Sequence, residues 1–144
     1  MAIAKYSLTV IDCPNPVALA NFYSQLTGFE MEPLGEIDPK DVKWFDLLRN
    51  GKAVIGFQRV ENYVAPTWPE GPVPQQIHLD FDVANLDEAE IHVLALGAQR
   101  AQFQSSDKFR VYLDPVGHPF CLVLNPNLEN FQDPLTLEVT TSRI

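Results

Sequence analysis

The residues with the clearest capacity for chemistry are a histidine and an aspartate two positions apart, His78 and Asp80, in the alternating segment 75–83. Successive side chains of a strand point to opposite faces, so these two share a face, with Cα atoms ~6.6 Å apart. An aspartate beside a histidine can orient the imidazole ring, as in a general-base pair. The alternative interpretation is that both side chains face solvent or fix a loop.

The two cysteines, Cys13 and Cys121, are too few for a disulfide framework and indicate a protein with reduced thiols. Cys121 lies in an apolar run between Phe120 and Leu122, where a cysteine usually acts as a small buried hydrophobic residue. No lysine or arginine stands near it in sequence to favour the thiolate, so we expect no nucleophile there.

Aromatic residues supply a second set of candidate contacts. Trp68 stands in the segment Pro-Thr-Trp-Pro at 66–69, where proline restricts the backbone. An aromatic side chain on a rigid loop can form one wall of a ligand pocket at low entropic cost. The alternative is a hydrophobic plug that closes the open end of a sheet. Trp44 and Phe57 lie on predicted strands, and we expect them to line either the core or a cavity.

The elements that position these residues occur twice in the chain. The order strand, helix, strand and a two-stranded hairpin is predicted for residues 4–60 and again for residues 75–124. An asparagine caps each helix and a glycine ends it. Equivalent positions are Asn15 and Asn85 at the helix starts, Gly28 and Gly97 at the helix ends, and Gly51 and Gly117 in the hairpins.

This repeat predicts an α+β fold of two tandem βαβββ modules that form a curved eight-stranded mixed sheet around a cavity. We interpret residues 1–144 as a single domain. Its parts are module one (4–60), a proline-rich connector (61–74), module two (75–124) and a C-terminal tail strand (125–144), which either adds to a sheet edge or frays. We expect Tyr23 in the core, and we interpret Asp114 and His118 chiefly as residues of a hairpin turn.

Composition excludes several function classes. The chain of 144 residues has 10 Lys+Arg against 19 Asp+Glu, which gives a net charge of −9 at pH 7. This charge repels phosphate backbones and anionic lipids, and the basic residues form no run. The sequence contains neither an apolar stretch of ~18 residues nor a signal-peptide pattern. We therefore expect a cytoplasmic protein that binds neither nucleic acid nor membranes.

Several of these features together resemble the vicinal oxygen chelate superfamily. They are the paired modules, a helix that ends in Phe22-Tyr23 followed by Leu26 and Gly28, His78 in the first strand of the second module, and the Asp114-Pro115-x-Gly117-His118 hairpin. Within that superfamily, which includes glyoxalase I, extradiol dioxygenases and bleomycin-resistance proteins, the chain most resembles the glyoxalase-like branch.

The resemblance implies four positions for metal ligands, on the first and last strand of each module. Counted from the caps and hairpins, the positions of module one fall on Leu8 and Ile55, with Gln58 reached only by a one-residue shift in register. Those of module two fall on His78 and Cys121. Leucine and isoleucine cannot bind a metal ion, so His78 is the one good candidate and we assign no complete metal site.

The sequence therefore predicts a small-molecule-binding protein of the glyoxalase/bleomycin-resistance type, with no firmly bound cofactor and a tendency to form homodimers. The ligand-binding residues that we expect are His78, Asp80, Gln58, Trp68, Trp44, Phe57 and Cys121. One alternative is a metal-dependent lyase, isomerase or dioxygenase that uses His78 as a divalent-metal ligand. A second alternative is a module that sequesters an antibiotic or metabolite without turnover.

Overall fold

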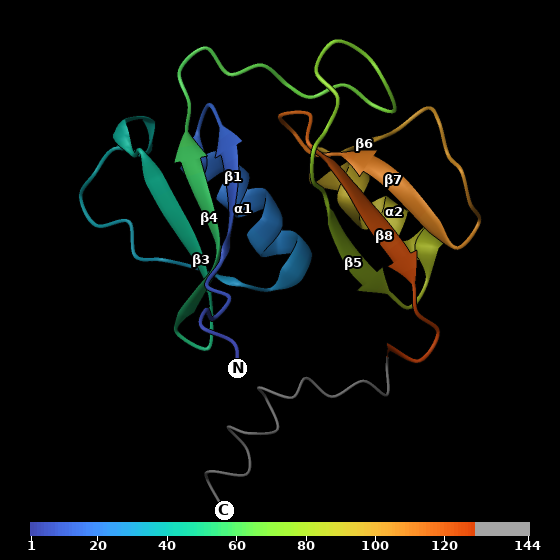
Figure 1. Ribbon diagram of the computed structural model, residues 1–144, viewed down its shortest axis with the longest axis horizontal. Helices are drawn as coiled ribbons and strands as arrows, with labels where there is room; N and C mark the ends of the chain where they lie inside the picture. Colours follow the sequence, from blue (N-terminus) through green and yellow to red (C-terminus); the bar gives the residue numbers. More distant parts are fainter. Residues whose placement is uncertain (129–144) are drawn as a thin grey trace, which may run out of the picture.

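The computed structural model describes residues 1–128, which form two similar modules that lie side by side (Figure 1). Module one consists of β1 (Thr9–Cys13), α1 (Pro16–Thr27), β2 (Glu30–Met31), the short 3-10 helix η1 (Pro39–Asp41), β3 (Trp44–Arg49) and β4 (Lys52–Arg59). Module two consists of β5 (Leu79–Val83), α2 (Leu86–Ala95), β6 (Gln99–Arg100), β7 (Phe109–Leu113) and β8 (Pro119–Leu124).

Each module forms a four-stranded mixed sheet, in the order β1-β4-β3-β2 and β5-β8-β7-β6. The first strand of each sheet runs parallel to the last, and the other pairs are antiparallel. These sheets confirm the predicted α+β fold of two βαβββ modules. The first strand starts later than residue 4, the predicted start of module one, because pairing with β4 begins only at Thr9. The predicted tail strand within 125–144 falls largely outside the described residues.

Both α-helices begin directly after the capping asparagines that the sequence predicts. The side chain of Asn15 accepts a hydrogen bond from the Ala18 amide (3.2 Å), and that of Asn85 accepts one from the Glu88 amide (3.0 Å). Helix α1 ends at Gly28, whose φ of 80° is a left-handed conformation that glycine adopts without strain. In the described part of the chain, neither α-helix is long and apolar enough to cross a bilayer.

The two modules share an aromatic core centred on Tyr23 of α1. This buried ring stacks on Phe57 of β4, with 5.8 Å between centroids, and contacts Phe81 and Phe120 of the second module at 6.1 and 6.3 Å. Aromatic pairs at these distances add attraction beyond the area that they bury. The expectation that Tyr23 belongs to the core is confirmed, and the structure adds that it joins the two modules.

The Tyr23 hydroxyl also makes a buried polar contact between the modules. It donates to Oδ2 of Asp114 at 2.6 Å, and Asp114 is only 3% exposed. The other oxygen of Asp114 accepts from the backbone amides of Val116 and His118, at 2.9 and 3.0 Å. Burial, followed by the neighbouring Asp114 carboxylate, raises the pKa of Tyr23 well above its ordinary value, so the hydroxyl remains a donor. Asp114 therefore holds the hairpin and binds it to α1.

We predict that Tyr23→Phe lowers the free energy of unfolding by about 1.5–3 kcal/mol, because a buried carboxylate loses a hydrogen bond. Urea denaturation followed by circular dichroism measures the change. Tyr112→Phe is the matched control, because the Tyr112 hydroxyl donates to Glu90 (3.1 Å), which keeps its contacts with Arg100 and Arg110. An equal loss in both variants would contradict a special role for the Tyr23–Asp114 bond.

Candidate functional site

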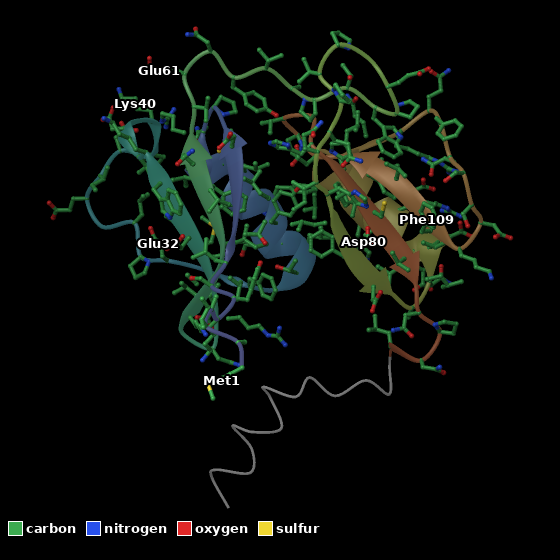
Figure 2. All side chains as sticks on the ribbon, viewed as in Figure 1. Met1, Glu32, Lys40, Glu61, Asp80 and Phe109 are labelled. Atoms are coloured by element: carbon green, nitrogen blue, oxygen red, sulfur yellow. The ribbon has the colours of Figure 1, made fainter. Side chains whose placement is uncertain are left out.

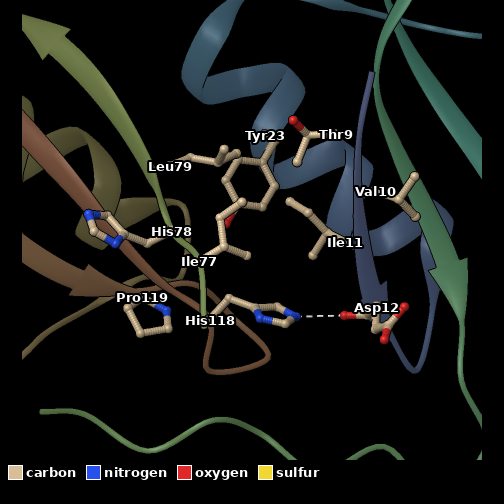
Figure 3. A pocket seen from close by; sticks show the side chains of 10 residues that line it. All are labelled: Thr9, Val10, Ile11, Asp12, Tyr23, Ile77, His78, Leu79, His118 and Pro119. Carbon is tan, nitrogen blue, oxygen red and sulfur yellow. Dashed lines mark hydrogen bonds between the residues drawn. The ribbon is translucent and has the colours of Figure 1, made fainter. Parts of the chain in front are cut away.

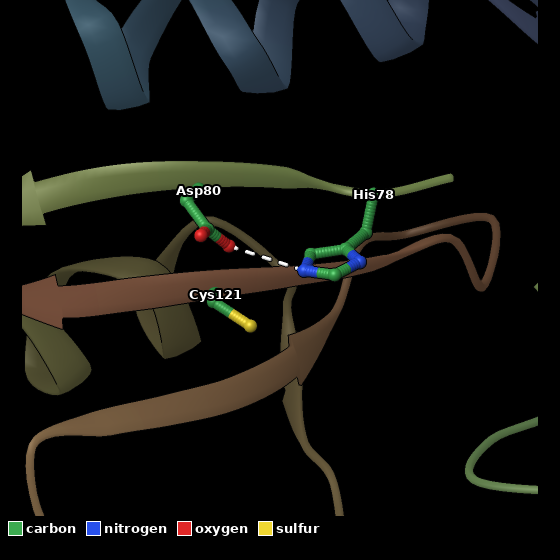
Figure 4. A group of neighbouring side chains, drawn as sticks. All are labelled: His78, Asp80 and Cys121. Carbon is green, nitrogen blue, oxygen red and sulfur yellow. Dashed lines mark ion pairs between the residues drawn. The ribbon is translucent and has the colours of Figure 1, made fainter.

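His78, Asp80 and Cys121 form a compact group on the face of the second sheet that lies opposite the core (Figure 4). Strands β5 and β8 are parallel, with Asp80 paired to Cys121, and His78 immediately precedes β5. His78 Nε2 lies 3.2 Å from Asp80 Oδ1, and one ligand atom from each of the three residues lies within 4.8 Å of the others. The two side chains therefore share a face, as predicted, and they are in direct contact on a surface where both remain partly exposed.

Trp68 brings the proline-rich connector onto the same sheet. Its side chain packs against a small apolar cluster formed by Ala101, Val111 and Cys121. Its indole Nε1 is buried and has no hydrogen-bond partner among the described residues. Trp68 thus covers the apolar neighbourhood of Cys121, an arrangement that fits both the wall and the plug expected from sequence.

The Cys121 thiol is a poor nucleophile in this setting. Burial, followed by the charge and hydrogen bond of Asp80, raises the pKa of Cys121 from 9.0 to about 11. The thiol is therefore protonated at neutral pH, which agrees with the expectation that it is not a nucleophile.

Module one carries different side chains at the equivalent positions. Counted from the capping asparagines, Val10 is equivalent to Asp80 and Leu8 is equivalent to His78. Val10 pairs with Gly56 as Asp80 pairs with Cys121, so Gly56 is the equivalent of Cys121. A Cβ atom on Gly56 would lie 2.7 Å from the Trp44 ring, so the indole occupies the space that a side chain at this position would need. Module one therefore offers apolar and aromatic surface where module two offers His78 and Cys121.

This register corrects the position inferred from the hairpin glycines. Ile55 is buried in the core, and its neighbour Gly56 is the equivalent of Cys121. Phe57 is fully buried and stacks on Tyr23, so it lies in the core rather than on the exposed face. The Gln58 amide donates to Asp12 Oδ1 at 3.1 Å, within module one.

A cleft of about 200 Å³ lies between the two modules, beside β1 and the start of β5 (Figure 3). The side chains of Ile77 and His118 point into it from module two and those of Thr9 and Ile11 from module one, whereas the side chains of His78 and Asp12 point away from it (Figure 3). Apolar side chains form much of the remaining wall. The lining residues are Thr9, Val10, Ile11, Asp12, Tyr23, Ile77, His78, Leu79, His118 and Pro119.

His118 is the cleft residue that sequence reasoning missed as a site residue. Its Nε2 lies 2.6 Å from the backbone oxygen of Asp12 and 3.3 Å from the Tyr63 hydroxyl. His118, Asp12 and Ile77 also line a second hollow of about 450 Å³ beneath the connector. The Asp-Pro-x-Gly-His motif of the hairpin contains His118 and could have marked it as a candidate site residue. The motif does not reveal the contact of His118 with module one, because that contact depends on how the modules pack.

The donors present do not form the four-position metal site that the family resemblance implies. Leu8 and Gly56 have no ligand atoms in their side chains, so both module-one positions lack a donor. His78, Asp80 and Cys121 remain as a nitrogen, an oxygen and a sulfur donor on one module. Such a mixed set suits zinc better than magnesium, which prefers oxygen ligands.

Comparison with known proteins relates the chain to one family. The family model described as "Glyoxalase-like domain" matches residues 8–123. No curated protein matches the chain.

Solved structures resemble the whole fold at low sequence identity. A glyoxalase/bleomycin resistance protein/dioxygenase family enzyme from Burkholderia phytofirmans is 22% identical, with a TM-score of 0.58 over 83% of this chain and 97% of that chain. The fosfomycin resistance protein FosX from Listeria monocytogenes is 16% identical, with a TM-score of 0.60 over 90% of this chain and 100% of that chain. A glyoxalase family protein from Enterococcus faecalis is 22% identical, with a TM-score of 0.58 over 85% and 99% of the two chains.

We predict that Asp80→Asn lowers the pKa of Cys121, because the substitution removes a negative charge that disfavours the thiolate. The fall in pKa is partial, because the effect of burial remains. At pH 9 only about 1% of a thiol with a pKa near 11 is ionised, so alkylation of Cys121 by iodoacetamide is expected to rise several-fold in the variant. Mass spectrometry of the Cys121 peptide, in EDTA, measures the rate. Asp82→Asn on the same strand is the control, and equal rates in Asp80→Asn and the wild type would contradict this account of Cys121.

Proposed function

Because the chain belongs to the glyoxalase-like domain family, we propose that it binds a small organic molecule in the cleft between β1 and β5. The observation that carries this proposal is the convergence on one cleft of residues from both modules. Ile77 and His118 come from module two, and Thr9 and Ile11 come from module one. Apolar walls with a few convergent polar groups are typical of small-molecule sites.

The proposed binding does not depend on the family's metal centre. Leu8 and Gly56 leave two of the four expected positions without a donor, and the Trp44 ring lies over Gly56. In this proposal, His118 and Thr9 supply polar contacts to the ligand, while Ile11 and Ile77 contact its apolar part.

A metal-dependent activity of the glyoxalase type is the second candidate. It is favoured by one observation, the ligand atoms of His78, Asp80 and Cys121 within 4.8 Å of one another. In that case the three residues would hold a divalent ion, which would act as a Lewis acid toward a bound oxygen.

We further propose that the protein acts in the cytoplasm as a homodimer. Cys13 and Cys121 are both free and buried, which suits a reducing compartment. Exposed apolar side chains of both modules, among them Val10, Trp44 and Ile77, are suitable for contact with a second copy.

The binding proposal predicts that filling the cleft abolishes ligand binding. We expect Ile77→Trp to remove the rise in Tm that cleft ligands cause in the wild type, because the Ile77 side chain points into the cleft and the indole would fill it (Figure 3). Ile91→Trp on α2 is the matched control, since Ile91 and Ile77 are 71% and 75% exposed and Ile91 does not line the cleft. Thermal-shift screening with a metabolite and antibiotic library, including fosfomycin, supplies the ligands.

Hits that stabilise Ile77→Trp as strongly as the wild type would contradict binding in this cleft. For each confirmed hit, mass spectrometry of the recovered compound separates sequestration, in which it is unchanged, from turnover.

The two candidate functions predict different metal contents. Protein purified without chelators is expected to contain well below one equivalent of zinc, nickel or manganese, with no difference between the wild type and His78→Ala. Inductively coupled plasma mass spectrometry measures the content. One equivalent of metal in the wild type that is lost in His78→Ala would reject the metal-independent proposal in favour of the second candidate.

A further inference from the structure

We propose that residues 64–76 of the connector form a flap over the exposed face of the module-two sheet, and that Trp68 is the side chain that holds this flap closed. The connector leaves module one near Glu61 and reaches β5 just before Asp80 (Figure 2). Opening of the flap uncovers the Cys121 thiol and the apolar surface beside it while both modules stay folded. Cys121 does not line the proposed ligand cleft, so the flap and the cleft can be tested independently.

Within residues 1–128, no hydrogen bond joins the flap to either module. The bonds that it makes are internal, since the Thr67 amide donates to the Val73 carbonyl at 2.6 Å and the Gln76 side chain donates to a flap carbonyl at 3.2 Å. Tyr63, which precedes the flap, is fixed by a 2.8 Å hydrogen bond from its hydroxyl to the hairpin of module two. The flap is thus attached to the modules through its two ends and through apolar contacts.

Buried polar atoms of the flap lack hydrogen-bond partners. They are Thr67 Oγ1, Trp68 Nε1 and Gln75 Oε1, and no other buried side-chain nitrogen or oxygen in the described part of the chain is unpaired. A polar atom that is removed from water without gaining a partner disfavours the state that buries it. Because opening returns all three atoms to water, their burial opposes the closed position.

Apolar packing of Trp68 supplies the opposing stabilisation. Its side chain packs against the cluster of Ala101, Val111 and Cys121, and an indole buries a large apolar area. No other flap residue belongs to this cluster or to the main core, and none is fully buried. Segments with few buried contacts open at a lower free-energy cost than the rest of a fold.

The remainder of the flap packs loosely on the modules. A hollow of about 450 Å³ lies beneath it, lined by Pro66 and Gln75 among others. Ala65 comes close to Gly117 of the hairpin, where the glycine has no side chain to interlock with it. Loss of the Trp68 contact therefore removes most of the packing that keeps the flap closed.

The flap controls access to one part of the exposed face. Cys121 is 6% exposed, whereas the side chains of His78 and Asp80 are 37% and 57% exposed. The closed flap thus leaves the polar pair accessible and covers the apolar surface next to it. Opening gives an apolar molecule or a thiol reagent access to Cys121 without unfolding of the sheet.

Alkylation of the two cysteines in the full chain measures this opening. Cys121 is the reporter, and Cys13, which lies in the main core at 0% exposure, is the internal control. The protein is treated with iodoacetamide in EDTA at 0 to 1 M urea, and mass spectrometry of both peptides gives the rates. We expect the Cys121 rate to change by less than about twofold, because a local opening exposes little surface. The Cys13 rate should rise about tenfold, because unfolding exposes much more.

Trp68→Ala removes the packing that keeps the flap closed and is expected to raise the ratio of the Cys121 rate to the Cys13 rate about tenfold. The ratio corrects for any loss of overall stability, because unfolding exposes both cysteines. Trp44→Ala removes the other tryptophan of the chain, which covers the equivalent position of module one, and is expected to leave the ratio unchanged.

Equal urea dependence of the Cys13 and Cys121 rates in the wild type would overturn the inference, and this result requires no variant. An unchanged ratio in Trp68→Ala, or an equal increase in Trp44→Ala, would also overturn it. Each of these results would leave the proposed binding in the cleft intact.

Discussion

The hydrogen bond between Tyr23 and Asp114 is the contact on which the arrangement of the two modules depends. A buried carboxylate must be paired or be protonated, and Asp114 meets this requirement with one hydroxyl and two backbone amides. The hairpin that the amides shape presents His118, and the hydroxyl fixes that hairpin against α1. The position of His118 against β1, and with it the cleft between the modules, follows from this single buried group.

The two modules have the same fold but different chemical surfaces. The positions of His78 and Cys121 in module two are occupied by Leu8 and Gly56 in module one, and Trp44 covers the glycine. A metal site shared by two modules needs donors from both. Because module one supplies no donor, the proposed binding relies on direct contacts between the ligand and side chains such as His118. The remaining donors of module two explain why a metal-dependent activity is the second candidate.

Sequence predicted the parts of the fold that local signals control. Helix caps and alternating strands were sufficient to locate α1, α2 and the repeat, and period-two alternation placed His78 beside Asp80. Counting from hairpin glycines misplaced the equivalent of Cys121 by one residue, because β3 and β4 change register between Leu47 and Leu48. The contacts of Asp114 and His118 with module one join residues 91 and 106 positions apart, so no local pattern reveals them.

A crystal structure of the protein with a ligand from the thermal-shift screen tests the central claim most directly. The account predicts that the ligand lies between β1 and the start of β5, in contact with His118 and Ile11. A ligand bound instead in the hollow between α1 and α2, lined by Leu26 and His92, would contradict it.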